Sequence, residues 1–144
     1  MARVQRVSPA EAKKLLDGGY CYLDVRSVEE FGARHPAGAV NIPLTVSGDE
    51  FVETAAAFFG ENAKIVVGCA TGVRSQKAAK LLVEAGFSDL VDLRTGLDGA
   101  RGAFGQKLEA GWAEAGFAVV EGQDDGSYEA VKAAVQRSGA AARS

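Results

Sequence analysis

The chain has 144 residues, the length of one domain with a single hydrophobic core. Hydrophobic residues make up 47% and charged residues 24%, and the formal net charge of −3 gives no broad basic surface for a nucleic acid. No apolar run approaches the ~20 residues of a membrane span, and the sequence after Met1 lacks the apolar stretch of a secretory signal, so we expect a cytoplasmic protein.

Short apolar runs alternate with helical patterns over most of the chain. Ser8 and Ser27 each precede a glutamate by three residues, which predicts two helices that begin with capping boxes. In chain order we predict an extended segment at 4–7, a helix at 9–17, a strand at 20–25, a short helix after 27–30, a strand at 39–42, a helix at 48–59, a strand at 64–68, a helix at 75–85 and a strand at 90–93. This order predicts a mainly parallel sheet with helices on both faces.

The remaining third of the chain carries weaker signals. Residues 94–111 are glycine-rich and predicted to be partly helical, and 112–115 suggest one helical turn before an apolar segment at 117–120. Residues 121–127 read as a polar linker, and Tyr128, Val131 and Val135 predict a short amphipathic helix at 128–137, with 138–144 frayed. We therefore divide the chain into a domain at 1–120 and a linker with a short helix and frayed tail at 121–144.

Cys69 lies at the junction between the predicted strand at 64–68 and the predicted helix at 75–85. In a parallel sheet this junction lies beyond the carboxyl ends of the strands, where functional sites gather. Backbone N–H groups converge there, and the helix N-terminus adds roughly half a positive charge. Both effects favour the thiolate, which is the nucleophilic form of cysteine. The segment predicts a reactive cysteine in an anion-binding cradle formed by Ala70, Thr71, Gly72, Val73 and Arg74.

Other candidate groups carry less chemistry. Arg74 adds a permanent charge to the cradle, or it pairs with a structural carboxylate. Cys21 lies inside a predicted strand, so we expect it to be buried and inert. His35 is the only histidine, and we expect a turn histidine with satisfied hydrogen bonds rather than a general base; Glu30 is expected to cap its helix. Because no Cys-x-x-Cys pair occurs, we expect no metal site, and we expect no cofactor.

Two motifs occur in order along the chain. The first consists of Leu23-Asp24-Val25-Arg26, Glu29-Glu30-Phe31, His35 and Gly38-Ala39-Val40-Asn41-Ile42-Pro43. The second consists of Val66-Val67-Gly68-Cys69-Ala70-Thr71-Gly72-Val73-Arg74-Ser75, with a helix behind it that carries Ala78-Ala79 and Leu81-Leu82. Over about residues 5 to 100, and more weakly at 112–119, these motifs resemble the single-domain rhodanese family of sulfurtransferases.

The resemblance implies a rhodanese-like α/β fold with a mainly parallel five-stranded sheet flanked by helices on both faces. It also implies that Cys69 takes a sulfane sulfur from a donor such as thiosulfate, holds it as a persulfide and passes it to a thiophilic acceptor. Cyanide, a thiol, or a thiol protein such as thioredoxin is the expected acceptor. Asp24 and Arg26 would form a charge network with Arg74, with Arg26 facing the substrate; the pair could instead only hold its loop in shape.

The chain departs from the family pattern in two places. Arg34-His35-Pro36-Ala37-Gly38-Ala39 stands where the family usually has Gly-His-Ile-Pro-Gly-Ala. After the last strand, Thr95-Gly96 replaces a paired glycine, and Trp112 comes late because residues 101–111 form an extra segment. Arg101 and Lys107 in this segment could supply positive charge to the active loop, and this leaves the donor open.

Two other functions compete with sulfur transfer. A cysteine-loop phosphatase or arsenate reductase holds a tetrahedral anion in a loop one residue longer than the four residues between Cys69 and Arg74 here, so the shorter loop favours a single sulfur atom. A sulfur-carrier or interaction module that delivers persulfide sulfur to a protein partner would use the same cysteine, and the sequence does not separate it from the enzyme.

Overall fold

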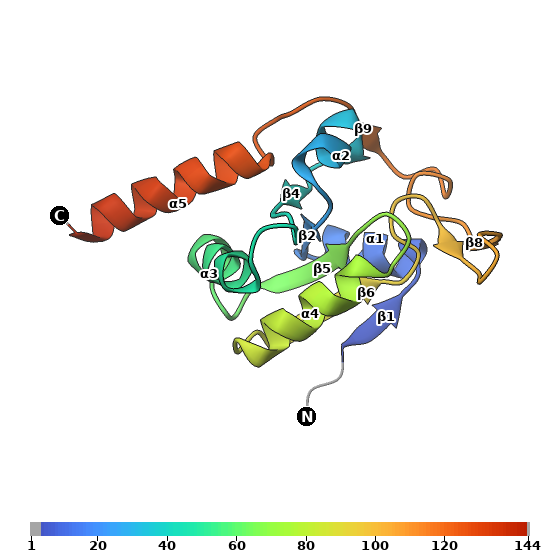
Figure 1. The fold of residues 1–144 in the computed structure, drawn as a ribbon, viewed down its shortest axis with the longest axis horizontal. Helices are drawn as coiled ribbons and strands as arrows, with labels where there is room; N and C mark the ends of the chain where they lie inside the picture. The colour runs from blue at the N-terminus through green and yellow to red at the C-terminus, as the bar shows by residue number, and fades with distance from the viewer. Residues whose placement is uncertain (1–3, 144) are drawn as a thin grey trace.

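A parallel five-stranded sheet forms the centre of the computed structural model, which describes residues 4–143 and the side chains of residues 4–138 (Figure 1). Its strand order is β1-β6-β5-β2-β4, and every neighbouring pair is parallel. The strands are β1 (Gln5–Val7), β2 (Cys21–Asp24), β4 (Val40–Asn41), β5 (Lys64–Gly68) and β6 (Asp89–Leu93). The predicted parallel five-stranded fold is confirmed.

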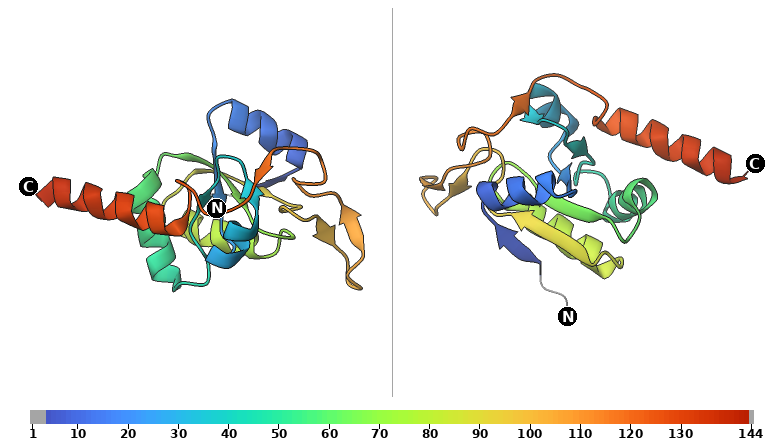
Figure 2. Two further views of the ribbon diagram at one scale, coloured as in Figure 1. Left: turned by 90° about the horizontal axis from the view of Figure 1, so that it is seen from above. Right: turned by 180° about the vertical axis from the view of Figure 1, so that it is seen from behind.

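Helices cover both faces of the sheet. They are α1 (Pro9–Asp17), α2 (Val28–Ala33), α3 (Gly48–Phe59), α4 (Arg74–Glu84) and α5 (Tyr128–Arg143). One core packs α3, α4 and the first turn of α5 against the sheet, and a second core packs α1 and α2 against the other face. Figure 2 shows α1 on the side opposite α3 and α4.

The alternation of side chains along β5 explains why the sheet needs two cores. Ile65 and Val67 point into the first core and Val66 into the second, and all three are fully buried. The helix boundaries follow the predicted caps. Ser8 Oγ accepts the Glu11 N–H at 3.1 Å while Glu11 Oε1 accepts the Ser8 N–H at 3.0 Å, which completes the capping box of α1.

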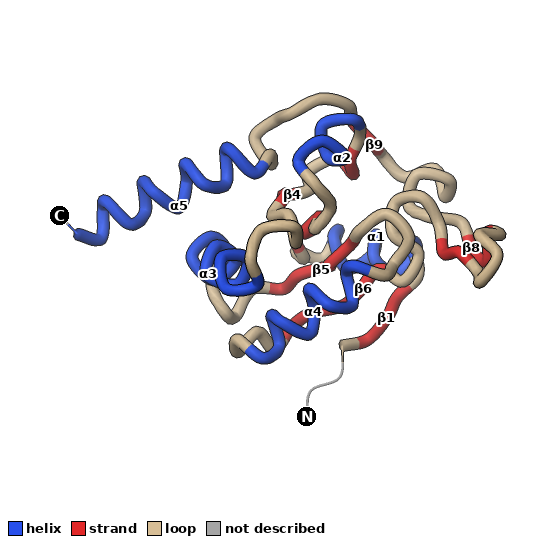
Figure 3. The backbone as a smooth tube through the Cα atoms, viewed as in Figure 1, coloured by secondary structure: helices blue, strands red, loops and turns tan. Residues whose placement is uncertain are grey.

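Two small antiparallel ribbons lie outside the main sheet. β3 (His35–Pro36) pairs with β9 (Val119–Val120), and β7 (Ala100–Arg101) pairs with β8 (Lys107–Glu109). The second ribbon is a hairpin where the sequence predicted partial helix, and Figure 3 shows it as strand and loop. Its turn closes with the Gly105 N–H donating to the Gly102 carbonyl at 2.9 Å, so the glycines form a turn rather than end a helix.

The segment after β9 folds back onto the sheet. The Asp124 N–H donates to Ser127 Oγ at 2.7 Å, and the Asn41 N–H of β4 donates to the Gly126 carbonyl at 2.7 Å. Tyr128 and Val131 then bury the first turn of α5 in the first core. The helix continues to Arg143, past its predicted end at 137, and extends away from the sheet (Figure 1). The division of the chain at residue 120 stays a prediction, and residues 1–3 and 144 lie outside the described part.

Candidate functional site

Cys69 directly follows β5, and its side chain lies beneath the loop that leads into α4. The residue is only 1% exposed. Its Sγ accepts the Gly72 N–H at 3.1 Å and lies 3.5 Å from Ser75 Oγ, within hydrogen-bonding distance for sulfur. The strand, the loop and the first turn of the helix therefore all converge on one sulfur atom.

The backbone amides of the loop supply positive ends of dipoles around this sulfur. Of the amide N–H groups of Ala70 to Arg74, that of Gly72 alone has a hydrogen-bond partner among residues 4–143, and the partner is Sγ. α4 begins at Arg74, and Val73 at its N-cap position provides no side-chain cap. Unpaired amides at the start of a helix favour a bound anion. The predicted cradle is thus a loop with donors available for a negatively charged group.

A second loop, residues 94–98 after β6, holds the cysteine loop in place. The Leu97 N–H donates to the Cys69 carbonyl and the Asp98 N–H to the Ala70 carbonyl, each at 2.8 Å. Gly72 has φ 89°, and a Cβ there would lie 2.0 Å from the Arg94 carbonyl oxygen. The two loops pack too closely for a side chain at this position. Sequence reasoning did not find the roles of Leu97 and Asp98, because backbone bonds do not depend on residue type.

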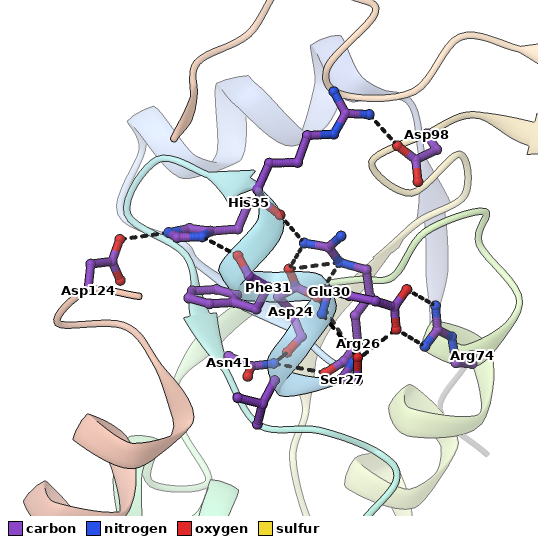
Figure 4. Close-up of polar contacts among 12 residues, drawn as sticks. Asp24, Arg26, Ser27, Glu30, Phe31, His35, Asn41, Arg74, Asp98 and Asp124 are labelled. Atoms are coloured by element: carbon purple, nitrogen blue, oxygen red, sulfur yellow. Dashed lines mark hydrogen bonds and ion pairs between the residues drawn. The ribbon is translucent and has the colours of Figure 1, made fainter. Parts of the chain in front are cut away.

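Arg74 forms a two-bond ion pair with Glu30 on α2 (Figure 4). Arg74 Nη1 lies 2.7 Å from Glu30 Oε1 and Nη2 lies 2.9 Å from Oε2, with each side chain 37% exposed. Hydrogen bonds from Arg74 and Ser27 lower the pKa of Glu30 from 4.5 to about 2. Glu30 also completes the predicted capping box with Ser27. Of the two roles considered for Arg74, the structure contains the carboxylate pairing.

Asp24 and Arg26 form a separate, buried ion pair at the end of β2. Arg26 Nη2 lies 2.8 Å from Asp24 Oδ2 and donates to the Arg34 carbonyl at 2.7 Å. The two side chains are 2% and 4% exposed, and among the described residues no hydrogen bond joins either of them to Arg74. Asn41 Nδ2 ties the loop to β4 through the Asp24 and Arg26 carbonyls. Asp24 and Arg26 contact each other, but the described residues show no hydrogen bond that joins them to Arg74 in the expected network; Arg26 instead ties the loop after β2 to the end of α2.

The other predicted polar residues lie in structural contacts. His35 is fully buried, with Nδ1 2.8 Å from the Phe31 carbonyl oxygen and Nε2 2.6 Å from Asp124 Oδ2, so both ring nitrogens have partners as expected (Figure 4). Lys107 pairs with Glu114, and Arg101 donates to the Asp98 carbonyl.

The expectation that Cys21 is buried is wrong: it is exposed. It is the first residue of β2 and does not belong to either core. Within residues 4–143 no group of three or more His, Cys, Asp and Glu side chains could hold a metal ion, and no helix there is long and apolar enough to cross a membrane.

One family model matches this chain over more than half of its length. The Rhodanese-like domain family matches residues 8–103. "Thiosulfate sulfurtransferase 16, chloroplastic" of Arabidopsis thaliana is 40% identical over 94 residues, which cover 60% of this chain and 78% of that protein. "Thiosulfate sulfurtransferase GlpE" of Pseudomonas fluorescens is 30% identical over 111 residues, which cover 77% of this chain and 97% of that protein.

Some relatives are matched over only part of their length, and a solved structure shares the fold. The chain spans only 56% of the senescence-associated protein DIN1 of Raphanus sativus, to which it is 34% identical. The crystal structure of Rv0390 from M. tuberculosis aligns with a TM-score of 0.71 over 84% of this chain and all of that chain. At 21% identity this last likeness concerns the fold alone.

Proposed function

Because the chain belongs to the Rhodanese-like domain family, we propose that it is a sulfurtransferase that carries sulfur as a persulfide on Cys69. The observation that carries this proposal is the position of Sγ, which accepts the Gly72 N–H at the start of α4. An anionic sulfur is stabilised there by amide dipoles that are already in place, without reorganisation during the reaction. Relatives named thiosulfate sulfurtransferase support thiosulfate as the donor.

The proposed reaction has two steps. The Cys69 thiolate attacks the sulfane sulfur of thiosulfate, a new S–S bond forms to Sγ, and the original S–S bond breaks so that sulfite leaves with its electron pair. The acceptor then attacks the terminal sulfur of the persulfide; with cyanide the product is thiocyanate, and the Cys69 thiolate is regenerated. The terminal sulfur lies one S–S bond, about 2.05 Å, beyond Sγ, so nearby amides of Ala70 to Arg74 can stabilise its charge.

The charged side chains would have different roles in this cycle. Glu30 accepts hydrogen bonds from two of the five N–H groups of the Arg74 guanidinium, and the other N–H groups remain available for thiosulfate. We therefore assign Arg74 to the binding of thiosulfate. Asp24 and Arg26, buried against each other, are assigned to holding the loop after β2. Cyanide serves as the assay acceptor, and a thiol protein such as thioredoxin is the proposed acceptor in the cell. A cytoplasmic location stays the expectation from the sequence.

The experiment is an intact mass measurement of the pure protein before and after thiosulfate, and again after cyanide. We expect a gain of about 32 Da, one sulfur atom, that cyanide removes. Because Cys21 is exposed, the Cys21→Ser variant is the matched control and must still gain the sulfur. Cys69→Ser must lose the gain while melting like the native protein. Sulfur loading or turnover that persists in Cys69→Ser would overturn the proposal.

The same measurement separates the alternatives. Loss of the added mass to reduced thioredoxin but not to cyanide would favour a carrier that delivers sulfur to protein partners. Absence of any gain with thiosulfate, together with hydrolysis of a phosphate monoester or reduction of arsenate, would favour the cysteine-loop phosphatase or arsenate reductase. The loop of four residues between Cys69 and Arg74 argues against that chemistry.

A further inference from the structure

Arg6, on the edge strand β1, contacts the cysteine loop. Its Nε donates to Asp92 Oδ2 at 2.8 Å, and its Nη2 donates to the Gly72 carbonyl at 2.8 Å. Arg6 and Asp92 are directly paired across β1 and β6. Asp92 is 1% exposed, and its Oδ1 has no partner among the described residues, so Arg6 is the ion-pair partner of this buried carboxylate. The carboxylate thus holds the guanidinium against the loop.

The same carbonyl accepts a second hydrogen bond from the other side. Gln76 Nε2, in the first turn of α4, donates to Gly72 O at 3.0 Å. A carbonyl oxygen has two lone pairs, so both are used. Figure 1 shows the end of β1 and the start of α4 beside the loop that follows β5. Side chains from β1 and α4, which are far apart in the sequence, therefore both donate hydrogen bonds to one peptide group of the cradle.

The orientation of this peptide group matters for a bound anion. The peptide between Gly72 and Val73 is trans, so its N–H points away from the carbonyl that Arg6 and Gln76 hold. Turning this peptide over would change ψ of Gly72, which glycine tolerates, and φ of Val73. Val73 has φ −90°, and the turn would bring it to a positive φ that a β-branched residue disfavours, so Arg6 and Gln76 add to a restraint that Val73 already supplies. A turned peptide would replace the Val73 N–H with a carbonyl oxygen, whose partial negative charge repels an anionic sulfur.

We propose that Arg6 and Gln76 are positioning residues that hold the Gly72–Val73 peptide with its N–H available to the Cys69 sulfur and its donor. The proposal concerns the reactive state of Cys69 and rests on the proposed sulfur transfer for its biological meaning. Arg6 acts through backbone and does not contact Sγ among the described hydrogen bonds. It is a part of the site that lies 66 residues before Gly72 in the chain.

The test measures the reactivity of Cys69 without relying on sulfur transfer. In a Cys21→Ser background, iodoacetamide alkylates Cys69, and its rate is followed from pH 5 to pH 9. We expect Arg6→Met to slow alkylation at pH 7 by about three- to tenfold, because a charge-assisted hydrogen bond to the loop is lost. Arg6→Lys should restore part of the rate because it keeps a charged donor.

Gln76→Met separates the hydrogen bond from the charge. It removes a neutral donor and leaves Asp92 paired, so it stays informative even if Arg6→Met fails to fold. We expect about a twofold effect alone, and in the double variant a loss larger than the product of the single losses, since each residue backs up the other. Arg137→Met, which removes an exposed charge on α5, is the control and should leave the profile unchanged.

Two outcomes overturn the proposal. One is folded Arg6→Met and Gln76→Met proteins that are alkylated at the native rate over the whole pH range; the other is an equal loss of rate in Arg137→Met, which would indicate net charge alone. Thiosulfate loading of the same variants gives a separate readout. If the parent protein takes up no sulfur but the alkylation effects appear, sulfur transfer fails as the function and the positioning role stands.

Discussion

Replacing Glu30 with glutamine tests how the loop around Cys69 depends on the ion pair between Arg74 and Glu30. Glutamine keeps the shape and an oxygen that can accept the Ser27 N–H of the capping box, but it removes the carboxylate charge that Arg74 contacts at 2.7 and 2.9 Å. The substitution therefore isolates the ionic part of the interaction from packing and from helix capping.

The contribution of this ion pair to the free energy of unfolding follows from the lowered pKa of Glu30. A change from 4.5 to about 2 corresponds to about 3 kcal/mol of stability if the charges were shielded from water. Both side chains are 37% exposed, so screening by solvent reduces this to about 1 kcal/mol. Because the folded-state pKa is lowered, this contribution is complete above about pH 4.5 and disappears as the pH falls toward 2.

Urea unfolding at a series of pH values from 7 down to 3 measures the effect. At pH 7 we expect Glu30→Gln to lower the free energy of unfolding by about 1 kcal/mol, and we expect the difference from the native protein to shrink below pH 4.5. Glu29→Gln is the control, since Glu29 is exposed in the same first turn of α2 and shares its helix-dipole environment. A difference that is independent of pH, or equal in the two variants, would refute the reasoning.

Three further substitutions test the loop and the C-terminal helix. Gly72→Ala should lower stability by about 2–3 kcal/mol in urea unfolding and abolish sulfur loading, because it adds a backbone clash to an unfavourable positive φ. Gly116→Ala, with the same φ of 89° and no atom within 4 Å of an added Cβ, is the matched control and should lose only the φ cost. Arg74→Ala should lower kcat/KM for thiosulfate by about 10²-fold, and an unchanged value would mean that the loop amides suffice. Val131→Ala should lower stability by about 2 kcal/mol in thermal unfolding because its side chain is fully buried, and Val135→Ala should cost less because Val135 is half-buried. Negligible losses in both variants would mean that α5 does not contribute to the stability of the domain.

Local sequence signals predicted the elements that surround the site. The helix at 48–59 and the strand at 64–68 match α3 and β5 at both ends, because serine caps, glycine stops and the periodicity of apolar residues act within a few residues. Cys69 was placed correctly between β5 and α4 for the same reason. Signals of this kind depend only on neighbours along the chain.

Contacts between segments far apart in the sequence could not be predicted from local signals. Glu30 meets Arg74 across 44 positions and Arg6 meets Gly72 across 66, because the strand order β1-β6-β5-β2-β4 decides which loops are neighbours. The hairpin of β7 and β8 was predicted as partly helical since its glycines fit a loop, a turn or a helix end equally well. Cys21 was misplaced because a strand's end residue shares its pattern but not its burial.

The hydrogen bond from the Asn41 N–H to the Gly126 carbonyl protects an edge strand of the sheet against pairing with another molecule. Strands at the border of a sheet can recruit a strand from another molecule, which starts aggregation. Here β1 has three residues and β4 has two, and the segment before α5 already occupies an amide of β4. The sheet therefore offers little to intermolecular strand pairing. Removing the chain from residue 121 onward would uncover that border and make the protein more prone to aggregate.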